Sequence, residues 1–144
     1  MKDEPIVVVK TVNAPAAKVW KALTDKDEMK KWYFDIPEFK PVTGLEFQFV
    51  GGDEENQFLH LCKVMEVIPG KKLAHTWRYE GYEGNTLVTF ELFDEGNDTT
   101  TVKLAHEGVE TFPKIPSFKK ENFVGGWNQI IGVSLPKFLE ENKQ

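Results

Sequence analysis

The chain is poor in residue types that several common functions require. Among its 144 residues there is one cysteine, Cys62, and one arginine, Arg78. A single cysteine excludes a disulfide bond within the chain. With a formal charge of −5 and a single arginine, the chain also lacks the basic surface that binds the phosphates and guanines of nucleic acids. We therefore expect neither a disulfide framework nor a nucleic-acid partner.

Long apolar runs are missing at the N-terminus. The first ten residues, MKDEPIVVVK, contain neither the apolar region of a signal peptide nor a membrane-spanning segment. A cytoplasmic protein is therefore expected. At 144 residues, 40% of them hydrophobic, the chain is long enough for one domain with a real core and short for two. We expect residues 1–144 to form a single domain.

The N-terminal part predicts a strand followed by two short helices. Residues 5–12, PIVVVKTV, are rich in β-branched side chains, which favour a strand. Pro15 suits a first helical position, and apolar residues at helical spacing follow it. Asp25, with Glu28 three residues later, resembles a capping box that opens a second short helix.

From Gly44 to His106 the apolar residues recur with a period of two. Clusters of glycine, proline, asparagine and aspartate separate five such segments: LEFQFV, FLHLCKVMEV, KLAHTWRYE, NTLVTFELF and TTTVKLAHE. This pattern is typical of an antiparallel meander.

The connections between these segments predict which side chains share a face. If they are tight hairpins, directly opposed residues point to the same side of the sheet. One face is then apolar and carries Cys62, Val64, His75, Trp77, Tyr79, Thr86, Val88, Phe90, Leu92, Val102, Leu104 and His106. The other face carries Thr76, Arg78, Thr89, Glu91, Thr101 and Lys103. A sheet of this kind needs a cover over its apolar face.

The expected cover is the C-terminal segment 123–141, FVGGWNQIIGVSLPKFLEE. At about 100° per residue, one sector collects Phe123, Val124, Trp127, Ile130, Ile131, Ser134, Leu135 and Phe138. Gly125, Gly132 and Pro136 fall on the opposite side, where they suit a helix that bends over a concave sheet. Alternatively, the helix begins only at Gly126 after an irregular approach.

Four blocks of sequence carry a resemblance to a known family: APAAKVWKALTDKDEMKKWY (14–33), VMEVIPGKKLAHTW (64–77), TLVTFELFDEGNDTTTVKLAHEG (86–108) and GGWNQIIGVSLPKFLEE (125–141). In this order they resemble the START-like superfamily, and within it the proteins similar to the activator of the ninety-kilodalton heat-shock protein ATPase, often grouped with polyketide cyclases. The resemblance implies an α+β helix-grip fold. In that fold a curved antiparallel sheet has about six strands, two short helices follow the first strand, and a long C-terminal helix packs across the concave face.

The resemblance also implies a cavity between the sheet and the terminal helix. Many bulky side chains are predicted to point inward, and large aromatic side chains either line such a space or fill it. The candidate ligand-binding residues are Trp32, Phe47, Phe49, Cys62, Val64, Trp77, Tyr79, Val88, Phe90, Leu104, His106, Phe123, Trp127 and Ile131.

A few polar side chains are expected toward one end of the same face. Cys62, Tyr79, Thr86 and His106 are placed where they could hold the polar end of a bound molecule. The alternative is a purely structural role, because a histidine that finishes a strand is more often solvated or bonded to backbone than a working base.

The sequence offers little support for catalysis. It contains only two serines, and no nucleophile can be grouped with a base and a third residue. Its three histidines and one cysteine lack metal-ligand spacing, so we expect no metal and no cofactor.

Three functions stand as hypotheses. The first is a small soluble protein that binds a hydrophobic or aromatic molecule, such as a lipid or a polyketide-like metabolite, beneath the terminal helix. The second is a stress-related module that interacts with a chaperone, which the resemblance alone implies. The third is a cyclase or hydrolase that uses Tyr79 and His106 for proton transfer. We expect a binding protein rather than an enzyme.

Overall fold

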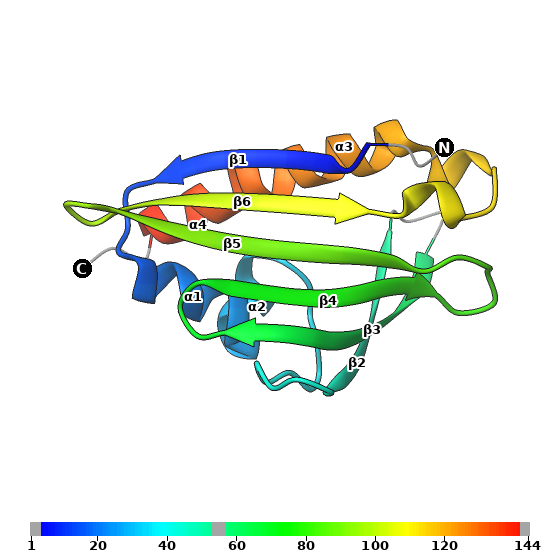
Figure 1. Ribbon diagram of the computed structural model, residues 1–144, viewed down its shortest axis with the longest axis horizontal. Coiled ribbons are helices and arrows are strands. Elements are labelled where there is room, and N and C mark those ends of the chain that lie inside the picture. Colours follow the sequence, from blue (N-terminus) through cyan, green and yellow to red (C-terminus); the bar gives the residue numbers. More distant parts are fainter. Residues whose placement is uncertain (1–3, 53–56, 142–144) are drawn as a thin grey trace.

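The computed structural model describes residues 4–52 and 57–141 of the chain. Its strands are β1 (Ile6–Val12), β2 (Glu46–Gly52), β3 (Gln57–Ile68), β4 (Lys72–Tyr79), β5 (Thr86–Gly96) and β6 (Thr99–Glu107). They form one antiparallel sheet in the order β1-β6-β5-β4-β3-β2 (Figure 1). The predicted meander is therefore confirmed, and β1 completes it by pairing with β6.

The helices lie on one side of this sheet (Figure 1). Two of them, α1 (Ala16–Thr24) and α2 (Lys26–Trp32), follow β1. The single turns η1 (Val109–Thr111) and η2 (Pro116–Phe118) lead from β6 into the terminal helix, which consists of α3 (Lys120–Gln129), η3 (Ile130–Ser134) and α4 (Leu135–Glu141). Both α1 and α2 contact α4, and α3 and η3 contact β1. This is the predicted helix-grip fold. No helix among the described residues is long and apolar enough to cross a bilayer.

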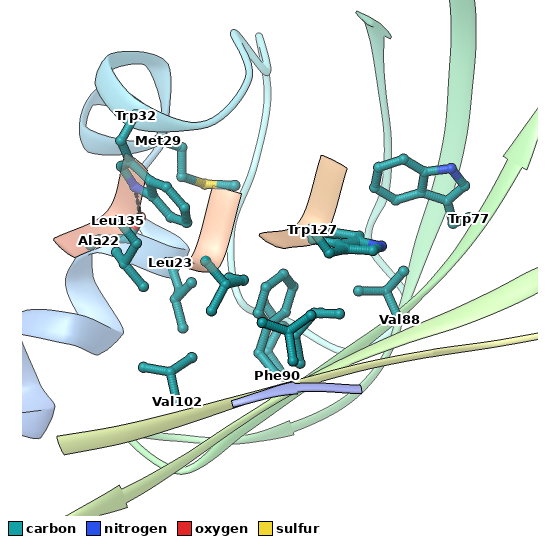
Figure 2. Close-up of a cluster of buried hydrophobic side chains, with 14 of the residues drawn as sticks. Ala22, Leu23, Met29, Trp32, Trp77, Val88, Phe90, Val102, Trp127 and Leu135 are labelled. Carbon is teal, nitrogen blue, oxygen red and sulfur yellow. Dashed lines mark hydrogen bonds between the residues drawn. The ribbon is translucent and has the colours of Figure 1, made fainter. Parts of the chain in front are cut away.

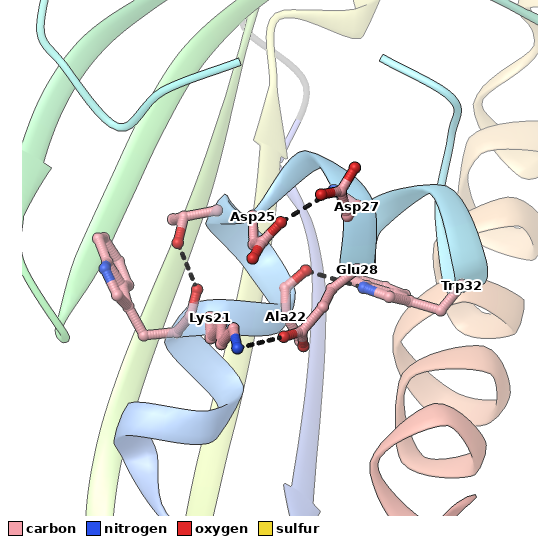
Figure 3. A network of polar contacts seen from close by, with 8 residues as sticks. Lys21, Ala22, Asp25, Asp27, Glu28 and Trp32 are labelled. Atoms are coloured by element: carbon pink, nitrogen blue, oxygen red, sulfur yellow. Dashed lines mark hydrogen bonds and ion pairs between the residues drawn. The ribbon is translucent and has the colours of Figure 1, made fainter. Parts of the chain in front are cut away.

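The start of α2 differs in detail from the predicted capping box (Figure 3). The Asp25 carboxylate does cap the helix, because it accepts a hydrogen bond from the Asp27 amide at 2.9 Å. The Asp25 amide, however, donates to the Lys21 carbonyl, and Glu28 forms an ion pair with the Lys21 ammonium at 3.3 Å. The reciprocal half of the box is therefore replaced by a link back to α1.

The sheet has the two faces that the sequence predicts. Every residue assigned to the apolar face is buried, including Val88 and Leu104, whose side chains are fully enclosed. On the opposite face Arg78 is exposed and the threonines are half-buried. The pairs His75–Val88 and Val88–His106 lie directly opposite each other across β4, β5 and β6, as predicted, although the connection 80–85 between β4 and β5 is longer than a tight hairpin.

The terminal helix begins at Lys120, so Gly125 and Gly126 lie inside it and the later start at Gly126 is wrong. Its buried residues are Trp127, Ile131, Leu135, Phe138 and Leu139. Leu139 was not predicted, and Val124 was wrongly assigned to the covered sector, since 36% of its surface is exposed. A Cβ atom added at Gly125 or Gly132 would meet nothing within 4 Å, so these glycines do face outward.

One turn of the terminal helix is wider than an α-helical turn. In η3 the Leu135 amide donates to the Ile130 carbonyl five residues earlier, which is the π-helical pattern. Pro136 has no amide hydrogen, and in an α-helix its ring would crowd the carbonyl of Gly132. The widened turn directly before Pro136 accommodates this conflict, whereas the sequence predicted only an outward bend.

Candidate functional site

The predicted ligand-binding residues come together in one buried cluster, which His106 joins through its hydrogen bond to Trp127. Figure 2 shows five of them: Trp32, Trp77, Val88, Phe90 and Trp127. All of the predicted residues are buried except Phe123, which is half-buried. In Figure 2, Trp127 points from the helix toward Val88 and Phe90 of β5, with Trp77 beside it. Trp32 lies at the opposite end, where its indole nitrogen donates to the Ala22 carbonyl at 2.8 Å and ties α2 to α1.

These side chains fill the space rather than line an open one. The hollow enclosed between α1, α2 and the sheet measures about 10 Å³. A cavity of this size holds about one water molecule at most. Its walls are Leu23, Met29, Trp32, Tyr33, Phe39, Phe47, Leu73, His75 and Phe90. Of the two alternatives that the sequence left open, an open cavity or one filled by its own aromatic residues, the structure has the second.

Tyr33, which the sequence did not indicate, contributes a further ring to this interior. It is the residue at the C-terminal end of α2. Its ring centroid lies 6.4 Å from that of Trp127 on the helix, 6.4 Å from Phe49 on β2 and 6.5 Å from Phe90 on β5. Tyr33 was missed because it follows a helix end, where neither helical nor strand periodicity assigns a direction to the side chain.

The Tyr33 hydroxyl is buried without a hydrogen-bond partner, and it is the sole buried side-chain polar atom in that state within residues 4–52 and 57–141. Burial raises its pKa well above the usual value for tyrosine, and the nearby Cys62 and Tyr79 raise it further. The hydroxyl is therefore a protonated donor with no acceptor. Such a group costs about 1–3 kcal/mol and calls for an explanation.

His106, by contrast, is bonded through both ring nitrogens. The Trp127 indole N–H donates to its Nδ1 at 3.0 Å, and its Nε2 lies 2.7 Å from Thr86 Oγ1. Because the Thr86 hydroxyl donates to the Trp77 carbonyl at 2.7 Å, it must accept from Nε2–H. These hydrogen bonds run from the Trp127 indole through His106 and Thr86 to the Trp77 carbonyl, and we call them the relay. The relay assigns His106 as the neutral Nε2–H tautomer. Burial lowers its pKa to about 3, with His75 contributing.

The other polar groups predicted for this end are divided between two places. Thr86 and His106 form the relay, whereas Tyr79 accepts a hydrogen bond from the Trp77 indole at 2.9 Å. Burial raises the pKa values of both Cys62 and Tyr79, so both stay protonated near neutral pH. Tyr79 and His106 are thus engaged with different partners, which gives no support to a joint role in proton transfer.

The remaining histidines are also neutral. His60 donates from Nδ1 to the Phe58 carbonyl at 3.0 Å, and His75 from Nδ1 to the Thr76 carbonyl at 2.8 Å. Burial lowers the pKa of each to about 4. Within the described part of the chain, no group of three or more histidine, cysteine, aspartate or glutamate side chains is placed to hold a metal ion.

Comparison with known proteins identifies the family. Residues 13–140 match the family described as "Activator of Hsp90 ATPase homolog 1-like protein". The chain belongs to this family. No curated protein sequence is significantly similar to it.

Solved structures share the fold. DynU16, a protein from the dynemicin biosynthetic locus, is 25% identical with a TM-score of 0.79 over 98% of this chain and 49% of its own. The chain thus spans about half the length of DynU16. MLL2253 from Mesorhizobium loti is 23% identical with a TM-score of 0.78, covering 97% of this chain and 99% of its own. CalU16 from Micromonospora echinospora is 22% identical with a TM-score of 0.71, covering 97% and 76%.

Proposed function

We propose that the protein binds a hydrophobic or aromatic small molecule between its sheet and its C-terminal helix. The observation that carries this proposal is the unpaired Tyr33 hydroxyl in an interior walled by aromatic rings. Folded proteins pair nearly all buried polar groups, so an exception calls for an explanation, and a functional role is one of those known. Small-molecule sites generally combine such apolar walls with a few polar groups.

Two further features support a ligand site here. The terminal helix widens into a π-helical turn at η3, and such turns inside α-helices occur frequently at functional sites. Ile131, in this turn, is fully buried against the interior. DynU16, with the same fold, comes from a biosynthetic locus, which is consistent with a small organic molecule as the ligand.

The test is binding of a neutral aromatic probe, 2-naphthol, followed by NMR of the ¹⁵N-labelled protein. The chain has four tryptophans, so four indole N–H resonances are expected. Binding beneath the helix should shift the Trp127 resonance and leave that of Trp20 in place, because Trp20 lies outside the set of rings around Trp127. A probe that moves no interior resonance at saturation overturns the proposal.

Two substitutions in the same helical turn supply the matched control. Ile131 is fully buried and Val133 is 51% exposed. Ile131→Phe places extra volume in the proposed site, and Val133→Phe places the same ring in solvent. We expect the first to abolish 2-naphthol binding and the second to leave it unchanged, with circular dichroism confirming that both variants fold.

A second candidate function is interaction with a chaperone, favoured by the family match over residues 13–140. It predicts that the protein binds a purified ninety-kilodalton heat-shock protein and stimulates its ATPase. Absence of both effects at high micromolar concentration would remove this candidate and leave ligand binding untouched. The cyclase or hydrolase hypothesis has no comparable support, since Tyr79 and His106 hydrogen-bond to different groups.

A further inference from the structure

We propose that the side chain of Tyr33 is a plug that occupies the ligand's place, and that the ligand is a neutral aromatic molecule with an acceptor oxygen, such as an aryl ketone. This inference rests on the proposed function, because it concerns the same interior. It adds which residue leaves when the ligand binds, and which chemistry the ligand must have.

The Tyr33 ring lies between aromatic rings of the sheet and of the terminal helix. Its close ring contacts are with its own chain neighbours, Trp32 at 5.1 Å and Phe34 at 4.5 Å. Across the interior, its centroid distances to Trp127, Phe49 and Phe90 are 6.4, 6.4 and 6.5 Å, near the long end of the range for interacting rings. Trp77 lies closer to these walls, at 5.5 Å from Trp127 and 5.6 Å from Phe49. The hollow of about 10 Å³ lies beside Tyr33, not within the wall of rings around Trp77.

The hydroxyl makes the closed position of Tyr33 less favourable. Inside, it has no hydrogen-bond partner among the described residues. Outside, water would satisfy it, so leaving the interior regains a hydrogen bond. The other polar groups under the helix have the opposite preference, since Thr86, His106 and the Trp127 indole would each lose a bond by moving. Tyr33 is thus the group in the described interior that a ligand displaces most readily.

Tyr33 also lies at the border between the interior and solvent. Its residue surface is partly exposed, although its hydroxyl is buried. It stands between α2 and the segment 34–45, which contains no helix or strand. The side chain can therefore rotate outward without breaking the sheet ladders or the terminal helix.

Two protonated polar groups of the same interior determine the chemistry of the ligand. Cys62 and Tyr79 belong to the buried cluster against which Tyr33 packs, and both raise its pKa. Tyr79 already accepts from the Trp77 indole, and no acceptor for its own O–H is found among the described residues. A ligand oxygen that extends past the Tyr33 position would provide that acceptor.

A charged ligand would find no counter-charge in this interior. The buried polar residues are His60, His75, Thr86, Thr100 and His106, and all of them are neutral at physiological pH. Burying an unpaired charge is far more costly than burying a ketone that accepts one hydrogen bond. The site should therefore select a ketone and reject a carboxylate of the same size.

The experiment measures binding of acetophenone and benzoate to the wild type, Tyr33→Phe and Tyr33→Ala. Removing the unpaired hydroxyl strengthens the plug, so in Tyr33→Phe the folding equilibrium constant should rise, and the acetophenone affinity fall, by about tenfold each. Removing the plug in Tyr33→Ala should raise the affinity by about tenfold or more. Benzoate should bind none of them. Tyr82→Phe, at a tyrosine that is 41% exposed, is the matched control and should change neither quantity.

Distinct outcomes separate this inference from the proposed function. If acetophenone shifts the Trp127 resonance of the wild type but binds Tyr33→Phe equally well, the plug is wrong and ligand binding stands. If benzoate binds as tightly as acetophenone, the ligand class is wrong. If neither the wild type nor Tyr33→Ala binds any neutral aromatic probe, the proposed function fails. Should Tyr33→Ala not fold, the isosteric Tyr33→Phe still decides the question.

Discussion

Two buried polar side chains contact Trp127 from different sides, and they are held in opposite ways. His106 uses both ring nitrogens, at 2.7 Å to Thr86 and at 3.0 Å to the Trp127 indole. Tyr33 approaches the same indole ring at 6.4 Å between centroids and leaves its hydroxyl without a partner. One contact joins the terminal helix to the sheet by directional bonds, and the other only fills space.

The difference indicates which part of the interior is rigid and which part can be exchanged. A fully satisfied polar network fixes one arrangement, because any movement leaves a buried donor or acceptor unpaired. A ring with an unpaired hydroxyl has no such restraint. The β4-β5-β6 side of the interior, with His106, therefore acts as the fixed anchor of the terminal helix, and the α2 side, with Tyr33, is the replaceable part.

The largest effect is expected from acid, which breaks the anchored side. Burial lowers the pKa values of His60 and His75 to about 4 and that of His106 to about 3, from an ordinary value of 6.5. Between about pH 6.5 and pH 4 the unfolded chain therefore binds more protons than the folded protein. The free energy of unfolding has its full value above about pH 6.5 and falls as the pH drops toward 4. Each histidine contributes about 3 kcal/mol to this loss.

Together these losses approach the whole stability of a small domain, so we expect cooperative unfolding before pH 4 is reached. Urea titrations at several pH values between 7.5 and 4.5, read by tryptophan fluorescence, measure the slope. His106→Asn should reduce it. Stability that does not change over this range would contradict neutral, bonded histidines. Tyr33 stays protonated throughout and adds nothing to the slope.

The next largest effect is expected from substitution of Trp127, which contacts both His106 and Tyr33. Trp127→Ala removes a buried indole and leaves His106 Nδ1 without its donor, so the free energy of unfolding should fall by about 3–5 kcal/mol. Trp127→Phe keeps most of the ring packing and should lose less. Val133→Ala, at an exposed position of the same helix, should stay within about 0.5 kcal/mol in urea unfolding. Equal losses for alanine and phenylalanine would assign the whole effect to the hydrogen bond.

A smaller effect separates the anchored side from the replaceable side by hydroxyl deletion alone. Thr86→Val keeps the shape but leaves His106 Nε2–H without its acceptor and removes the hydroxyl that donates to the Trp77 carbonyl, which should cost about 1–3 kcal/mol in thermal or urea unfolding. Thr86→Ser retains the hydroxyl and should lose less. A Thr86→Val variant as stable as the wild type would mean that the relay does not hold His106.

Much of the fold was predictable because every segment of the sheet repeats the same alternation of apolar and polar side chains. In the segments from Leu45 to Glu107, a register slip of one residue would turn every apolar side chain outward, so the alternation alone specifies the faces. The pairing of Val88 with His75 and His106 followed from it. The π-helical turn did not, because it depends on how the docked helix accommodates Pro136, and this is a property of packing rather than of periodicity.

The residues that surround the candidate site were predictable from the sequence, whereas the residue that fills it was not. Residues such as Phe49, Phe90 and Trp127 belong to periodic segments whose inward direction can be calculated. Whether they enclose a cavity depends on Tyr33, a single side chain beyond a helix end. The role of His106 depends likewise on Trp127, 21 residues away in the sequence, and no local pattern contains that hydrogen bond.

The smallest effect concerns the glycines of the terminal helix, which belong to neither side of the interior. A Cβ at Gly125 meets nothing within 4 Å, so Gly125→Ala should raise the free energy of unfolding by up to about 1 kcal/mol through helix propensity alone. Gly84→Ala is the matched contrast, since Gly84 has a φ of +104° and its Cβ would lie 2.7 Å from the Phe112 ring. That variant should be destabilised. If Gly125→Ala stabilises the fold without changing acetophenone affinity, the terminal helix is already fixed by His106, and ligand entry occurs on the Tyr33 side. A loss of affinity in Gly125→Ala would instead mean that the helix itself must bend to admit the ligand.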